Sequence, residues 1–214
     1  MQTSLMSKIL HFVLIATKKY GIDESHGLSH SLNVLHYSRK IYESEVKNYP
    51  ILKNQENLIY VSAVLHDMCD KKYMDERDGL NEIEKFLHCN NLLTPVEINV
   101  SKQIMSTMSY SKVKKDGFPD MGCYQKAYHI VREADLLTAY DFDRCIIYQM
   151  NKNNGNLNNA WENATELFNN RVFRHNEDGL FLFDYSRKES EILQNQALNR
   201  ISSWKKLITN PRVF

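Results

Sequence analysis

Apolar side chains recur at helical spacing along most of the chain. Within residues 5–16 they share one face, and Gly21 then predicts the end of a helix. The apolar stretch inside this segment is too short to cross a bilayer, and it lacks the small-residue cleavage pattern of a signal peptide. We therefore expect a helix that packs in the core, and no association with a membrane.

The next segments predict three further helices of different character. One follows the polar turn DESHG and has its apolar residues roughly on one face, one is apolar on nearly every side, and one is short and amphipathic. A helix that is apolar all round is typical of the middle of a bundle. We predict these helices over residues 28–45, 55–68 and 79–90.

The sharpest helix start in the chain lies at Thr94. Thr94 and Glu97 have the spacing of a capping box, and Pro95 occupies the first helical position. This pattern predicts a helix that runs to about Met108. The Gly, Pro and Lys residues of 109–123 then predict a loop.

The second half of the chain continues the helical pattern. An Asn-rich stretch at 151–159 indicates a surface loop. Around it we predict helices over residues 124–140 and 141–150, or one bent helix in their place, and then over 161–174 and 185–207.

Length and composition fit one globular domain. The chain has 214 residues, of which 43% are hydrophobic and 25% are charged, and these values are ordinary for a folded protein. Only 7 Gly and 4 Pro are present, whereas folds made of many short strands need frequent turn residues. We predict an all-α, compact single-domain bundle of about eight or nine helices over residues 1–214, completed by C-terminal helices within 157–207.

Charge and cysteine content restrict the partners. A formal net charge of +1 gives no basic surface of the kind that neutralises a nucleic-acid backbone. The four cysteines stand singly without a CxxC pair, which indicates reduced thiols and a cytoplasmic protein. We expect no nucleic-acid partner, and both a monomer and a homodimer remain open.

Four residues have the chemistry of a metal site. His66 and Asp67 are adjacent near the end of a predicted helix, where a departing backbone lets neighbouring side chains reach one ion. Such a doublet is also an ordinary helix end. His30 stands at the start of an earlier helix, and Asp135 is a carboxylate among apolar residues, where it needs a cation.

Three segments together resemble the HD superfamily of metal-dependent phosphohydrolases. They are DESHGLSHSLNVLHYSRKI, AVLHDMCDKKY and YHIVREADLLTAYDFDR, and the resemblance covers about residues 22–145. It implies that His30, His66, Asp67 and Asp135 bind a divalent metal ion. Two imidazoles and two carboxylates suit Mn, Mg, Co, Ni, Fe or Zn. Only His88 and His129 lie between the doublet and the last Asp, so we expect one ion rather than two.

The resemblance is greatest to small stand-alone members that hydrolyse nucleotides. It implies that Asp70 is the general acid/base, although a helix-end carboxylate paired with Lys71 or Lys72 is an equal alternative. His26 precedes His30 by one helical turn and is expected to contact phosphate rather than metal. The residues predicted to bind substrate are His26, Lys71, Lys72, Ser109, Lys112 and Arg144.

The expected activity is hydrolysis of a phosphate ester or anhydride of a nucleotide by a metal-activated water. A nucleotide pyrophosphohydrolase and a nucleotidase both fit the sequence. One alternative is a regulatory module that binds a nucleotide without turning it over. Another is an oxygenase on the same scaffold, which would need two irons and more histidines.

Overall fold

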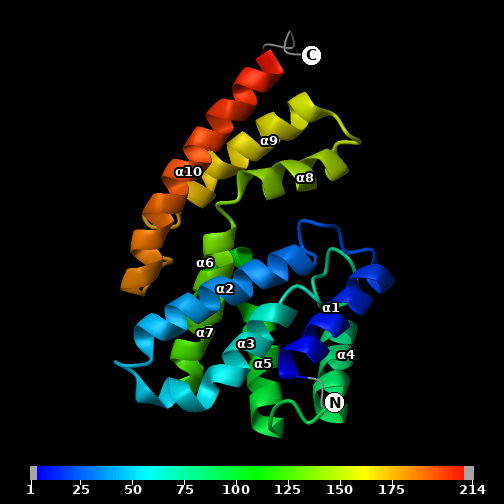
Figure 1. The fold of residues 1–214 in the computed structure, drawn as a ribbon, viewed down its shortest axis with the longest axis vertical. Coiled ribbons are helices and arrows are strands. Elements are labelled where there is room, and N and C mark those ends of the chain that lie inside the picture. Colours follow the sequence, from blue (N-terminus) through cyan, green and yellow to red (C-terminus); the bar gives the residue numbers. More distant parts are fainter. Residues whose placement is uncertain (1–3, 210–214) are drawn as a thin grey trace. The chain divides into compact units, whose positions relative to one another are not determined.

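The computed structural model describes residues 4–209, and these residues form helices and no strand (Figure 1). This confirms the all-α prediction, and the ten α-helices of the described residues are close to the expected eight or nine. The chain divides into two compact units, Met1–Asp135 and Leu136–Phe214, which are described separately. None of the described helices combines the length and the hydropathy needed to span a membrane.

The first unit is arranged around a central buried helix, α3 (Glu56–Leu65), which contacts α1, α2 and α5. Seven of its ten residues are buried, as the all-round apolar pattern predicted. The other elements of this unit are α1 (Leu5–Tyr20), α2 (Leu28–Glu45), the 3₁₀ segment η1 (Pro50–Gln55), α4 (Glu76–Cys89), α5 (Pro95–Thr107), α6 (Tyr110–Asp116), η2 (Gly122–Tyr124) and α7 (Gln125–Thr138), whose last three residues belong to the second unit.

Side-chain caps set where several of these helices begin. The Thr94 hydroxyl accepts a bond from the backbone N–H of Glu97, and the Glu97 carboxylate accepts one from the N–H of Thr94, so the predicted capping box is confirmed. Asp75 caps α4 by accepting bonds from the N–H groups of Arg77 and Asp78. This cap starts α4 three residues before the predicted position.

Two predictions in this unit were wrong in detail. The expected loop at 109–123 contains α6 and η2. The lysines of α6 are compatible with a helix, its Val113 is buried, and Gly117 ends it with a positive φ of 76°. The helix expected over 55–68 ends at Leu65, and a series of turns follows.

The second unit consists of α8 (Phe142–Lys152), α9 (Leu157–Asn170), the 3₁₀ segment η3 (Val172–Arg174) and α10 (Asp184–Thr209). Asp141 caps α8 and separates it from α7, so the two-helix alternative for 124–150 is correct. α9 starts four residues before the expected Trp161, because Asn156 caps it. Phe142, Phe168 and Phe173 join α8, α9 and η3 through edge-to-face contacts.

One close helix contact affects the turns after α3. Gly79 on α4 lies so near these turns that an added Cβ would be 2.8 Å from Cys69 Cα and 2.8 Å from Met74 Sδ. No other residue fits without moving the backbone at Cys69. The absence of a side chain at position 79 therefore lets α4 pack directly against the segment that follows His66.

Candidate metal centre

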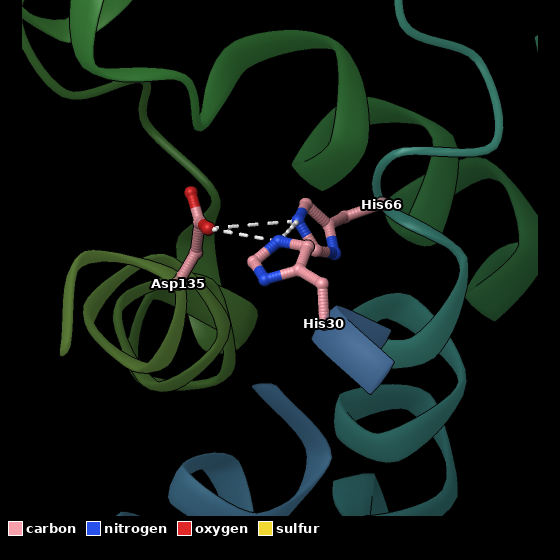
Figure 2. Close-up of side chains that lie close together, drawn as sticks. All are labelled: His30, His66 and Asp135. Carbon is pink, nitrogen blue, oxygen red and sulfur yellow. Dashed lines mark hydrogen bonds and ion pairs between the residues drawn. The ribbon is translucent and has the colours of Figure 1, made fainter. Parts of the chain in front are cut away.

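The His66-Asp67 doublet lies where α3 ends. The Met68 N–H bonds to the Leu65 carbonyl and the Asp70 N–H bonds to the Asp67 carbonyl, so the backbone turns away from the helix axis at this point. His30 comes from the first turn of α2, and Asp135 comes from α7. Figure 2 shows the imidazoles of His30 and His66 and the carboxylate of Asp135 pointing toward one another.

The separations between these groups fit ligands of one ion. The two Nε2 atoms of His30 and His66 are 3.2 Å apart, and Asp135 Oδ1 lies 3.5 Å from the first and 3.6 Å from the second. Ligand atoms about 2.1 Å from a common ion are about 3.0 Å apart at octahedral angles and about 3.4 Å apart at tetrahedral angles. His30, His66 and Asp135 therefore form a group that could hold a metal ion.

Asp67 adds a fourth oxygen to this group. Its Oδ2 lies 3.1 Å from His30 Nε2 and 3.3 Å from His66 Nε2. This oxygen is buried and accepts no well-aligned hydrogen bond from any described residue. A buried carboxylate oxygen that converges with imidazole nitrogens without a shared hydrogen bond fits a site built around a cation.

A hydrogen bond to the backbone fixes the orientation of the His66 ring. Its Nδ1 lies 2.8 Å from the carbonyl oxygen of Ala63, one turn earlier on α3, and donates a hydrogen bond to it. Nε2 then carries the lone pair and faces the other ligands. This is the usual way in which a second hydrogen bond prepares a histidine to bind metal.

The charges of the site act on one another strongly. Burial opposes protonation of His66, but the carboxylates of Asp67 and Asp135 raise its pKa well above the usual value of 6.5. Burial likewise opposes ionisation of Asp67 and Asp135, but His66 and His30 hold their pKa values well below 3.8. The two carboxylates thus favour a positive charge at the point where the imidazole nitrogens converge, which is where a metal cation would bind.

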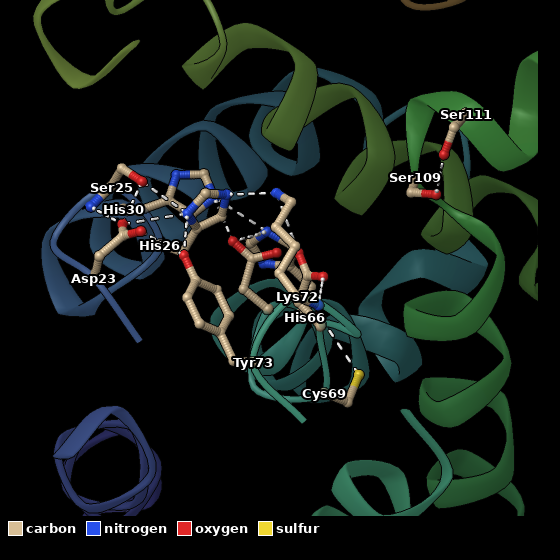
Figure 3. Close-up of polar contacts among 12 residues, drawn as sticks. Asp23, Ser25, His26, His30, His66, Cys69, Lys72, Tyr73, Ser109 and Ser111 are labelled. Carbon is tan, nitrogen blue, oxygen red and sulfur yellow. Dashed lines mark hydrogen bonds and ion pairs between the residues drawn. The ribbon is translucent and has the colours of Figure 1, made fainter. Parts of the chain in front are cut away.

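A second polar cluster adjoins the metal centre (Figure 3). The ring centroids of His26 and His30 are 6.2 Å apart. Around the His26 ring lie Ser25 Oγ and Tyr73 Oη on the Nδ1 side, at 2.7 and 3.0 Å, and Lys72 Nζ on the Nε2 side, at 3.0 Å. His26 and Lys72, both expected to bind substrate, therefore contact each other.

Asp70 also contacts Lys72. Its Oδ1 accepts a bond from the backbone N–H of Lys72 at 2.9 Å, and its Oδ2 lies 3.4 Å from Lys72 Nζ. The carboxylate pairing weighed as an alternative from the sequence is therefore present. A role of Asp70 as general acid/base stays a prediction.

Lys71 lines a pocket, whereas the neighbouring Lys72 contacts His26. It lines an open pocket of about 520 Å³ together with Lys112, Lys115 and hydroxyl-bearing residues at the end of α5 and on α6. Lys112 Nζ lies 2.5 Å from Glu76 Oε1 and 2.6 Å from the Ser106 carbonyl oxygen. Two of the lysines expected to bind substrate thus share one pocket wall.

The remaining predicted substrate residues are Ser109 and Arg144. Ser109 precedes α6, and its Oγ is 3.4 Å from Ser111 Oγ. Arg144 is on α8 in the second unit, and its backbone N–H donates to the Asp141 cap. A substrate contact by either residue stays a prediction.

Sequence reasoning missed Asp23 and Ser25 and the use of the Tyr73 hydroxyl. Asp23 Oδ2 accepts a bond from Tyr73 Oη at 2.6 Å, and Asp23 Oδ1 accepts one from the backbone N–H of Ser25 at 2.9 Å. The only signal in the sequence was the polar run DESH, which indicated a turn.

The chain was also compared with family models, curated proteins and solved structures, and no match was found.

Proposed function

We propose that this protein is a metal-dependent phosphohydrolase that binds one divalent cation through His30, His66, Asp67 and Asp135. The observation that carries the proposal is the convergence of two imidazole Nε2 atoms and two carboxylate oxygens from α2, the end of α3 and α7, with five separations between 3.1 and 3.6 Å. His30, the His66-Asp67 pair and Asp135 are far apart in sequence, so their meeting supports a common ligand.

The donor set restricts the chemistry. Two neutral imidazoles and two carboxylates contribute a charge of about −2, which a divalent ion balances. When bound, such an ion acidifies a water molecule and polarises a phosphoryl oxygen, which are the two requirements of hydrolysis. The exposed fraction of the Asp135 side chain, 27%, leaves the group accessible from solvent.

The substrate we propose is a nucleotide, attacked at a phosphate ester or anhydride bond. The resemblance of the three sequence segments to nucleotide-hydrolysing HD proteins supports the nucleotide, and the nearby cations support the phosphate. Lys72 and His26 would bind phosphate oxygens beside the centre, and Asp70 would orient the attacking water or return a proton to the leaving group.

Metal analysis combined with a substrate screen tests the proposal. Metal-free protein is loaded separately with Mn, Mg, Co, Ni, Fe and Zn, and nucleoside mono-, di- and triphosphates are supplied, with products identified by mass spectrometry. We expect one ion per chain and release of phosphate or pyrophosphate. His66→Ala should abolish both, whereas His88→Ala, which alters an exposed histidine on α4, should change neither.

Three outcomes would contradict the proposal. Nucleotide binding without turnover under every metal would indicate a regulatory module. Two irons per chain would indicate an oxygenase. A chain that binds no divalent ion at micromolar concentrations would remove the basis for either metal-dependent reaction.

A further inference from the structure

The cluster around His26 has a defined arrangement of protons. Ser25 Oγ and Tyr73 Oη each lie within 2.6 Å of a carboxylate oxygen of Asp23. An ionised carboxylate only accepts, so each hydroxyl donates its proton to Asp23. Burial raises the pKa of Asp23, but the hydrogen bonds from Ser25, Tyr73 and His26 hold it below its usual value, which keeps the carboxylate ionised.

These directions decide the state of the His26 ring. Because both hydroxyl protons point at Asp23, the oxygens of Ser25 and Tyr73 can only accept from His26 Nδ1. Nδ1 must therefore carry a hydrogen. The opposite nitrogen, Nε2, faces Lys72 Nζ at 3.0 Å, and an ammonium group only donates. A hydrogen on Nε2 would set two donors against each other, so Nε2 carries the lone pair.

The lone pair on Nε2 holds the ammonium group in place. Lys72 Nζ donates to it and also lies 3.4 Å from Asp70 Oδ2. A neutral imidazole orients an ammonium ion without cancelling its charge, whereas a second carboxylate in this position would neutralise it. Lys72 is 46% exposed, so its charge remains available to an anion that approaches from solvent.

We propose that Asp23, Ser25 and Tyr73 are positioning residues that fix His26 as its Nδ1–H tautomer, so that its Nε2 holds the Lys72 ammonium group for contact with an anionic phosphate. The arrangement links the turn before α2 with the turns after α3, and it lies beside the candidate metal centre. The contact with phosphate rests on the proposed function, whereas the tautomer does not.

The tautomer is tested by nitrogen-15 NMR of the histidine side chains in metal-free protein at mildly alkaline pH. We expect a protonated Nδ1 and an unprotonated Nε2 for His26, and a shift toward the other tautomer in Asp23→Asn and Tyr73→Phe. Tyr20→Phe is the matched control, because the Tyr20 hydroxyl donates to the carboxylate of Glu82 elsewhere in the same unit. A hydrogen on Nε2 in the unaltered protein would overturn the inference.

The phosphate contact is tested by calorimetry with inorganic phosphate on the magnesium-loaded protein. Replacing a side chain that hydrogen-bonds to a binding residue typically weakens binding 10- to 100-fold. We expect Tyr73→Phe and Asp23→Asn to weaken phosphate binding about tenfold or more, with magnesium affinity unchanged, and Tyr20→Phe to have no effect. Equal phosphate affinity in all three variants would overturn the positioning role.

The two proposals fail in distinguishable ways. If the unaltered protein binds magnesium and phosphate but hydrolyses no nucleotide, the proposed activity fails and the positioning role stands. If nucleotides are hydrolysed equally by Tyr73→Phe and the unaltered protein, with the tautomer unchanged, the positioning role fails and the activity stands.

Discussion

Two histidines of the first unit are buried to nearly the same extent, yet their pKa values move in opposite directions. His66 is 7% exposed and His129 is 6% exposed. For both residues burial favours the neutral ring. The carboxylates of Asp67 and Asp135 nevertheless raise the pKa of His66, whereas Arg132 and Lys126 add to the effect of burial and lower the pKa of His129 to about 3. The sign of the neighbouring charge therefore decides the outcome.

The charges around His66 and His129 therefore indicate which of these two buried polar clusters can bind a cation. The group around His66 has two carboxylates within 3.6 Å of its imidazole, and its excess negative charge attracts a proton or a metal ion. The group around His129 already contains a cation, the guanidinium group of Arg132. This group lies 3.2 Å from the Glu133 carboxylate, and both side chains are almost fully buried. Asp135 and His129 are both on α7, so one helix serves both environments.

The largest expected effect comes from removing one carboxylate of the candidate metal centre. Asp135→Asn keeps the shape of the side chain but removes its charge, and we expect manganese affinity to fall about 100-fold or more. Calorimetric titration of metal-free protein measures this loss. Asp120→Asn, which alters an exposed carboxylate of the same unit, is the control and should bind manganese normally. Unchanged affinity in Asp135→Asn would remove Asp135 from the site.

An intermediate effect is expected from His129 on acid stability. Below pH 6.5 the unfolded chain binds a proton at this ring, whereas the folded protein does not until about pH 3. Its contribution is therefore complete above pH 6.5, and the free energy of unfolding falls by about 1.4 kcal/mol per pH unit as pH decreases through this window.

Denaturant unfolding at pH 6 and pH 4 measures this contribution. His129→Gln, which cannot titrate and keeps a partner for Gln125, should lose less stability between these two values than the unaltered protein does. His88→Gln changes an exposed ring and should leave the dependence unchanged. Identical pH profiles for His129→Gln and the unaltered protein would show that the ring is protonated in the folded state.

The smallest effect is expected where water surrounds the charges. Arg39 and Glu43 form an ion pair of 2.7 Å on α2, with side chains 69% and 46% exposed. Solvent screens such pairs, so Arg39→Ala should leave the free energy of unfolding nearly unchanged. Thermal or denaturant unfolding checks this. A clearly measurable loss of stability would show that the charge on Arg39 stabilises the protein even though the ion pair is exposed.

Periodicity and capping were sufficient to predict most of the fold, because both act over a few residues. The capping box at Thr94 and the all-round apolar α3 were predicted correctly. α6 was missed because it is only seven residues long and has one buried side chain, Val113, so it offered no periodic pattern. The division of the chain into two units also has no signature in composition.

The candidate metal centre was predictable in part. His30, His66 and Asp135 were selected by their residue types and by the resemblance, and the structure brings them together. The network around His26 was not predictable, because Tyr73 lies fifty residues from Asp23 in sequence and nothing local indicates where its hydroxyl points. In the same way, the pairing of Lys112 with Glu76 depends on how α4 and α6 pack.

The close approach at Gly79 limits how this protein can vary. A methyl group at position 79 would lie 2.8 Å from the main chain of Cys69, so even alanine displaces the segment that begins at His66. Such a change would disturb the spacing of the imidazoles and carboxylates while leaving each of them in the sequence. A chain that retains all four candidate metal ligands could therefore lose the site through a substitution on a helix that supplies none of them.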